Sequence, residues 1–219
     1  MVERKKVTQD CVRFSGVGLE FEGILHLPKG DAPLPAVVVC HPHPLYGGDM
    51  YNNVVLAISD ALAEASTAAL RFNFRGVGRS EGEYGEGNGE QEDVVAALAF
   101  LESLNKVDQS RIGLAGYSFG AKVALPVALR QQRVRALALV SPFLMDAEWE
   151  QLKSYAVPKL FLCGSEDGFI SSHKVERLTA GLPGLSQCEV IAGADHFWGG
   201  YEAEVGRKVT AFFEVALQV

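Results

Sequence analysis

The stretch RIGLAGYSFGAKVAL, residues 111–125, constrains the fold most, because an apolar run passes in it directly into a segment with helical spacing. The junction is Gly116-Tyr117-Ser118-Phe119-Gly120, a Gly-x-Ser-x-Gly pattern. A serine at such a sharp strand-to-helix turn takes up a strained backbone, and only small residues two positions away on either side leave room for it. The stretch therefore predicts a strand ending at Tyr117, a helix beginning at Phe119 and Ser118 between them.

The rest of the chain alternates short apolar runs with longer segments of helical period, as in βα units on a mostly parallel sheet. Strands are predicted over 10–14 and 20–27, which form an antiparallel pair, and over 36–40, 68–74, 112–117, 136–140, 160–163 and 189–191. Helices are predicted over 53–64, 90–104, 119–130, 173–179 and 202–216. No repeat or linker divides the chain, so we expect one α/β domain over residues 1–219.

Composition excludes several classes of protein. The 219 residues are 48% hydrophobic and carry a net charge of −7, with no stripe of Lys and Arg to bind nucleic acid or an anionic membrane. No apolar run reaches the length of about 18 to 20 residues that a membrane helix needs, and the charged start MVERKKVTQD is unlike a signal peptide. We therefore expect a cytoplasmic protein, with the Gly- and Glu-rich segment 80–92 as a solvated loop.

A nucleophilic serine needs a base, and the base needs an orienting acid, both at the carboxyl ends of later strands. Asp167 follows the predicted strand PKLFLCG, and His196 follows CEVIAGA. Along the chain, the serine comes first, the acid second and the histidine last, as Ser118, Asp167 and His196. One superfamily of hydrolases has this order, and neither major serine-protease fold has it. We predict these three residues as the catalytic triad.

Each partner of the serine has competitors. Glu166 is adjacent to Asp167, but the later loop position is the usual one for the acid in this pattern. Asp195 is adjacent to His196, and neighbouring side chains diverge too far to form the required hydrogen bond. His26 lies in a predicted strand and His173 in a predicted helix, where structural roles are expected.

Four phrases together resemble the α/β-hydrolase superfamily over nearly the whole chain: GYSFG, LCGSEDGFIS, GADHFW and LRFNFRGVGRSEG. HPHPLYGGDM, followed by NFRGVGRSEGE and GLAGYSFGA, resembles a compact group of bacterial cytosolic hydrolases near the dienelactone hydrolases and the prolyl-oligopeptidase-like serine hydrolases. The resemblance implies an eight-stranded, mostly parallel sheet flanked by helices. Only residues 141–158 separate two predicted strands where many members insert a lid, so we expect no large cap domain. Dienelactone hydrolases carry cysteine at the elbow, and this chain has Ser118.

The resemblance also implies hydrolysis of an ester or thioester of a small acyl substrate through an acyl-enzyme, without a cofactor or metal. The tetrahedral oxyanion needs two backbone donors. Phe119 N–H supplies one. Pro42 and Pro44 have no N–H, so the second donor is His43, Leu45 or Tyr46, and the resemblance favours Leu45.

Other residues are predicted to contact the substrate. His43 and Tyr46 are expected at the rim of the site. The apolar side chains expected in an acyl-binding wall are Phe143, Leu144, Met145, Trp149, Phe197 and Trp198. A small core beneath the loop is the alternative role for these side chains.

Two other functions remain open from the sequence. His41 and His43 lie two residues apart, as in a His-x-His pair of a metallohydrolase, although no further ligands follow at matching positions. A non-catalytic binding protein with the same fold is the other alternative, since fold alone does not fix function. The sequence makes no prediction of oligomeric state.

Overall fold

The central strands are buried on both faces because helices cover both sides of the sheet. β3 (Leu34–Cys40) reads LPAVVVC. Val38 and Cys40 pack into one core, and Val37 and Val39 pack into the other. This continuous apolar run is what a parallel strand buried on both faces requires. The computed structural model describes residues 7–30 and 33–218, so the charged start 1–6, residues 31–32 and residue 219 lie outside the described part.

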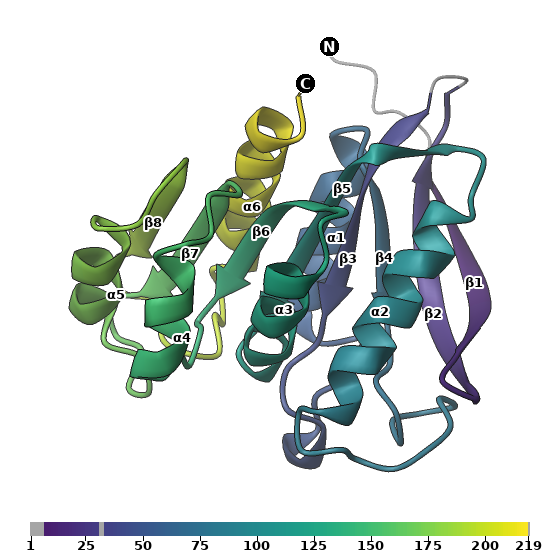
Figure 1. Cartoon of the computed structure of the whole chain (residues 1–219), viewed down its shortest axis with the longest axis horizontal. Coiled ribbons are helices and arrows are strands. Elements are labelled where there is room, and N and C mark those ends of the chain that lie inside the picture. Colours follow the sequence, from purple (N-terminus) through teal and green to yellow (C-terminus); the bar gives the residue numbers. More distant parts are fainter. Residues whose placement is uncertain (1–6, 31–32, 219) are drawn as a thin grey trace.

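Eight strands form one sheet in the order β1-β2-β4-β3-β5-β6-β7-β8 (Figure 1). β2 runs antiparallel to both of its neighbours, and the other neighbouring pairs are parallel. The remaining strands are β1 (Val7–Gly16), β2 (Leu19–Pro28), β4 (Ala68–Phe72), β5 (Val107–Tyr117), β6 (Val134–Val140), β7 (Lys159–Gly164) and β8 (Ser186–Ile191). This arrangement confirms the predicted fold class.

Helices cover the two faces unequally. α1 (Asn53–Glu64) and α6 (Glu202–Ala216) pack against each other on one face. On the other face, the core contains residues of α2, α3, α4 and α5 (Figure 1). Their bounds are α2 (Gly89–Glu102), α3 (Phe119–Arg130), α4 (Asp146–Leu152) and α5 (Ser172–Thr179), and a short 3₁₀ turn, η1, spans Pro44–Tyr46. Among the described residues, none of these helices is long and apolar enough to cross a bilayer.

The connection after β6 holds the short helix α4, where a loop through Trp149 was expected. No large cap is inserted there, as predicted from the length of residues 141–158. β4 ends at Phe72, two residues before its predicted end. Phe74 lies beyond the ladder because its N–H donates to His41 Nε2, at 3.1 Å, instead of to a neighbouring strand.

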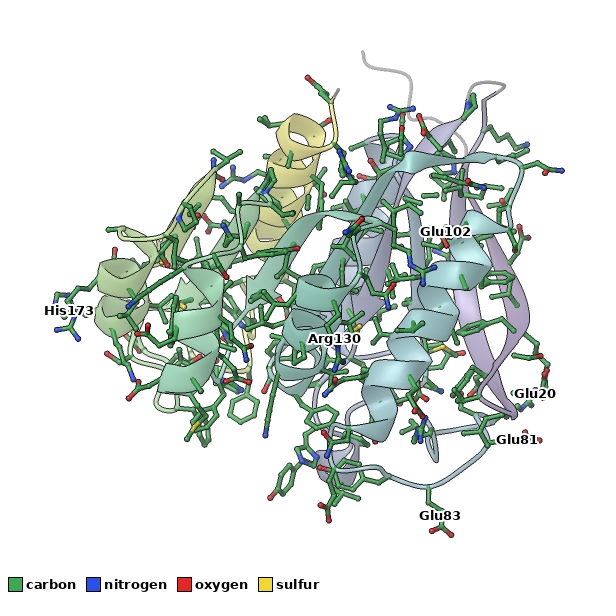
Figure 2. The ribbon with its side chains drawn as sticks, in the orientation of Figure 1. Glu20, Glu81, Glu83, Glu102, Arg130 and His173 are labelled. Atoms are coloured by element: carbon green, nitrogen blue, oxygen red, sulfur yellow. The ribbon has the colours of Figure 1, made fainter. Side chains whose placement is uncertain are left out.

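The Gly- and Glu-rich segment differs from its prediction as a solvated loop. The buried carboxylate of Glu90 accepts the backbone N–H groups of Gly85 and Gly87, both at 2.7 Å. Arg75 donates to the buried carboxylate of Asp93 at 2.7 Å, and its backbone N–H binds the same carboxylate. Glu83, by contrast, points to solvent (Figure 2). The loop is therefore anchored to the start of α2.

Candidate active site

The elbow at Ser118 has the strained geometry that the sequence predicted. Ser118 has φ 53° and ψ −111°, a region that L-residues rarely adopt. A Cβ on Gly116 would lie 2.4 Å from Gly120 O, and one on Gly120 would lie 2.3 Å from Cys40 O. Both positions therefore require glycine, and the end of β3 lies directly against the elbow.

A continuous chain of hydrogen bonds joins the three residues predicted as the triad. Ser118 Oγ lies 3.0 Å from His196 Nε2, and His196 Nδ1 lies 2.9 Å from Asp167 Oδ2. With Nδ1 protonated and donating to the carboxylate, Nε2 is free to accept the serine proton; this tautomer is assigned from the hydrogen-bond partners. The side chain of Asp167 is fully buried, and that of His196 is 13% exposed, so the base reaches the surface while the acid does not.

Four hydrogen bonds hold the Asp167 carboxylate. Oδ1 accepts the N–H groups of Phe169 and Ile170, at 2.9 and 3.0 Å. Oδ2 accepts from His196 and also from Ser141 Oγ, at 2.8 Å. Burial alone would raise the pKa of Asp167, but the bonds from His196, Phe169 and Ser141 outweigh it and lower the pKa overall. The acid is therefore ionised and fixed in orientation.

The competing residues lie in other environments. Glu166 is exposed, and Asp195 Oδ1 accepts the N–H groups of Phe197 and Trp198, at 2.9 and 3.0 Å. His173 projects into solvent from α5 (Figure 2). His26 is buried and accepts Arg71 Nε–H at 2.9 Å. None of these four joins the hydrogen-bonded chain at Ser118.

In the loop after β3, two of the three candidate oxyanion donors bond within the loop itself. Leu45 N–H donates to His43 Nδ1 at 3.3 Å, and Tyr46 N–H donates to His43 O at 3.1 Å, so the 3₁₀ turn occupies both donors. In this conformation, the Leu45 N–H predicted as the second oxyanion donor is therefore engaged within its own loop, and its catalytic role stays a prediction. Of the three alternatives, only the N–H of His43 bonds to no acceptor among the described residues. The His43 ring packs 4.7 Å from the Phe119 ring, which places this residue beside the elbow.

His41 and His43 do not face one another as metal ligands. The buried His41 ring donates from Nδ1 to Pro42 O at 2.7 Å and accepts Phe74 N–H at Nε2. Burial lowers the pKa of His41 to about 4, so this ring stays neutral. His43 Nε2 instead lies 3.2 Å from Tyr84 Oη. Within the described ranges, no three His, Cys, Asp or Glu side chains gather as a metal site, and the His41/His43 alternative has no geometric support.

Exposed apolar side chains surround the open site. They are Leu45, Tyr46, Phe143, Met145, Phe169 and Phe197, each at least 55% exposed, on loops after β3, β6, β7 and β8. The Phe169 ring lies 4.9 Å from the His196 ring, and the Phe197 ring lies 5.7 Å from it. These two aromatic rings therefore flank the base.

Two residues of the predicted acyl wall lie in the core instead. Trp149 is 5% exposed, and its ring stacks on Phe161 at 5.1 Å, because α4 turns it toward the sheet. Trp198 is fully buried and packs into the core on the side of α1 and α6. Leu144 is half-buried against the opposite core. These three residues therefore pack into or against the two main cores of the protein, and not into a separate small core beneath the loop.

Three contacts at the site were missed from the sequence. Ser141, at the carboxyl end of β6, donates to Asp167, and its position directly after a buried strand was the available signal. Phe169 lies two residues after Asp167, beside His196. Tyr84 reaches His43 from the Gly- and Glu-rich loop, where nothing in the sequence indicated that the loop folds back.

A cavity of about 600 Å³ lies away from these residues, against β1 and β2. Its lining includes Cys11, Arg13, Glu22, Tyr51 and Arg79 but no serine, threonine or histidine, so it contains no counterpart of the hydrogen-bonded Ser118–His196 pair. We therefore place the chemistry at Ser118, on an open surface, and not in this cavity.

Comparison with known proteins agrees with the fold. The sequence model of the alpha/beta hydrolase fold matches residues 35–159. An uncharacterized protein of Rickettsia prowazekii, RP471, is 32% identical over 216 residues, covering 94% of this chain and 89% of its own. The chain belongs to the α/β-hydrolase family.

Solved structures narrow the family to members without a lid. An alpha-beta serine hydrolase homologue from Coxiella burnetii has 34% identity and a TM-score of 0.81, over 92% of this chain and 96% of that one. XC6422 from Xanthomonas campestris, described as a serine hydrolase without lid, has 25% identity and a TM-score of 0.79, over 96% of both chains.

A sequence relative that is named as an enzyme matches a shorter part of the chain. Esterase FrsA of Klebsiella pneumoniae is 28% identical over 149 residues, which cover 66% of this chain but only 34% of the esterase.

Proposed function

We propose that this hydrolase-family protein cleaves carboxylic ester or thioester bonds of small acyl substrates through an acyl-enzyme on Ser118. The observation that carries the proposal is the hydrogen-bonded chain from Ser118 through His196 to Asp167, built on a strained elbow. Family membership and the similarity to an enzyme named as an esterase support the hydrolytic chemistry.

In the first step, His196 Nε2 takes the proton of Ser118 Oγ as the oxygen attacks the acyl carbonyl. Asp167 holds the Nδ1–H tautomer and stabilises the imidazolium that forms. Because the Asp167 carboxylate is buried and ionised, this attraction acts through a medium that screens it less than bulk water does.

The developing oxyanion needs donors that are already aimed at it. Phe119 N–H lies at the first turn of α3, where backbone N–H groups and the helix dipole both favour negative charge. We assign the second donor to His43 N–H, since the 3₁₀ turn occupies those of Leu45 and Tyr46. Each such donor lowers the activation barrier by about 2.7 to 4 kcal/mol in a comparable site.

In the second half of the reaction, His196 returns the proton to the leaving group, and the acyl group stays on Ser118 Oγ. Water then gives its proton to His196 and attacks the acyl carbon, which releases the acid and restores the serine. The exposed apolar rim, including Met145, Phe169 and Phe197, fits an apolar acyl or aryl group better than a charged one.

The function is tested with purified protein and p-nitrophenyl esters of graded acyl length, beside acyl-coenzyme A thioesters. We expect turnover of at least one series, a fall in kcat on the order of a millionfold in Ser118→Ala with folding intact, and labelling of wild type by a fluorophosphonate probe. A folded wild type that neither turns over these substrates nor reacts with the probe would indicate the non-catalytic binding protein instead.

The rim is tested with Met145→Ala and with Val215→Ala, an equally exposed apolar residue on α6, as the matched control. We expect the ranking of acyl lengths to change in Met145→Ala and to stay unchanged in Val215→Ala. An unchanged ranking in both variants would remove Met145 from the acyl-binding wall.

A further inference from the structure

Three strained residues lie in one chain of hydrogen bonds. Outside glycine, six described residues have positive φ, and three of them are Ser118 (53°), Ser141 (44°) and Trp198 (61°). Ser118 bonds to His196, which bonds to Asp167, which bonds to Ser141, which bonds to Trp198. Such strain persists only where the surroundings over-determine it, and it clusters at functional sites.

The contacts of Ser141 fix the direction of its hydroxyl proton. Trp198 Nε1–H is only a donor and lies 3.1 Å from Ser141 Oγ, so the serine oxygen must accept there. The single Ser141 proton therefore goes to Asp167 Oδ2, at 2.8 Å. Both Ser141 and Trp198 are fully buried, so water does not compete for these bonds.

We propose that Ser141 and Trp198 are a positioning pair that holds the Asp167 carboxylate in its catalytic orientation, an inference that rests on the proposed hydrolytic function. Neither side chain touches the reacting atoms, and both act through Asp167. The chain joins three loops, since Ser141 follows β6, Asp167 follows β7 and Trp198 lies two residues after His196 in the loop after β8.

The position of Trp198 is itself fixed. Asp195 Oδ1 accepts its backbone N–H at 3.0 Å, which shapes the turn that also carries His196. Movement of Trp198 would therefore shift the base, and loss of the Ser141 hydroxyl would free one oxygen of the acid. The pair thus couples the placement of His196 to the orientation of Asp167.

Ser141 also affects how readily the Asp167 carboxylate takes up a proton. The Ser141 hydroxyl is one of the hydrogen bonds that keep the pKa of Asp167 low. Besides His196, the titratable groups near this carboxylate are Tyr117 and Cys163. Burial raises the pKa of Tyr117, and the neighbouring Cys188 together with burial raises that of Cys163, so both stay neutral at working pH. Loss of the Ser141 bond should therefore make proton uptake by the Asp167 carboxylate easier.

The experiment compares Ser141→Ala, Trp198→Phe and the double variant on an ester that wild type hydrolyses, with Ser103→Ala, an exposed serine at the end of α2, as control. We expect kcat to fall about ten- to a hundredfold in Ser141→Ala with KM unchanged, and the acid limb of kcat/KM to move to higher pH. Ser141→Cys, which keeps a weak donor, should recover part of kcat. Trp198→Phe should lose less, and nothing further in the Ser141→Ala background.

Proton NMR of the bond between His196 Nδ1 and Asp167 provides a readout that needs no turnover. Its far-downfield resonance should be present in wild type, absent in His196→Ala and shifted in Ser141→Ala. If the resonance shifts but no variant or wild type hydrolyses esters, the proposed function fails and the positioning pair stands. If Ser141→Ala stays folded and its kcat, the acid limb of its pH profile and its resonance are all unchanged, the proposal of a positioning pair is overturned. The proposal is also overturned if the activity of Ser141→Ala falls while the acid limb and the resonance stay where they are in wild type.

Discussion

The loops after β7 and β8 and the loop after β3 meet at the same serine but contribute by different means. The first two deliver side chains, Asp167 and His196, which chemistry identifies in a sequence. In the proposed mechanism, the loop after β3 contributes a backbone N–H, while the rings of His41 and His43 accept or donate bonds within that loop. Side-chain chemistry can therefore be predicted from residue type, whereas the direction of an N–H depends on the turn that the backbone adopts.

The two regions also differ in what holds them. Four hydrogen bonds fix the Asp167 carboxylate. The loop after β3 is fixed by sterics and by its own short bonds: a Cβ on Gly48 would lie 2.2 Å from Pro42 O, and Gly48 N–H donates to His43 O. The predictions below separate these two kinds of support.

The largest effect is expected in the side-chain region. In Asp167→Asn, the amide no longer stabilises the imidazolium and favours the wrong tautomer of His196. We expect kcat to fall about ten-thousandfold with folding intact, as the corresponding change does in a serine protease. The control Glu166→Gln, at the exposed neighbouring position, should keep wild-type kcat, and the reverse pattern would assign the acid to Glu166.

A smaller effect is expected in the backbone region. Gly48→Ala places a methyl group against Pro42 O and forces the turn to shift, which moves the His43 N–H away from the oxyanion. We expect kcat to fall about a hundred- to a thousandfold, the effect of losing one oxyanion donor. Gly30→Ala, where a Cβ meets nothing within 4 Å, is the control. A folded Gly48→Ala with wild-type kcat would remove His43 N–H from the oxyanion hole.

The smallest effect concerns acid stability. The pKa of His41 falls from 6.5 to about 4 on folding, mainly through burial, so the unfolded chain binds more protons between these values. Its contribution, about 3 kcal/mol, is complete above pH 6.5 and is lost as pH falls toward 4. The stabilisation from Asp167, whose pKa is lowered from 3.8, is lost only at more acidic pH.

Urea unfolding between pH 7 and pH 4.5 checks this order. The free energy of unfolding should fall with pH in wild type and fall less in His41→Gln. His26→Gln is the variant to compare with His41→Gln, because burial also lowers the pKa of His26 to about 4. If His41→Gln and wild type lose the same free energy over this range, His41 is not buried as a neutral ring.

Much of the fold followed from local patterns. Apolar runs such as that of β3 specify strands buried on both faces, and the glycines around Ser118 specify the elbow by sterics alone. The short connection after β6 excluded a large cap. These features depend on residues close in sequence, so they could be predicted.

Contacts between distant segments were harder to predict. Trp149, in α4 after β6, and Trp198, in the loop after β8, follow the carboxyl ends of strands near the site. Both turn inward, because a neighbouring core offers each of them more burial than the open site does. The Gly- and Glu-rich loop was expected to be solvated, but Glu90 accepts two of its N–H groups and anchors it.

The sequence by itself determined the α/β class, the elbow and the identity of Ser118, Asp167 and His196, because residue type and strand order limit which side chains can reach one edge of a parallel sheet. Only the tertiary structure decided which N–H after β3 is left free and which apolar side chains face solvent. It also decided that Trp198 bonds to Ser141 and Ser141 bonds to Asp167. These depend on turn geometry and on packing between segments far apart in the chain, which no local pattern encodes.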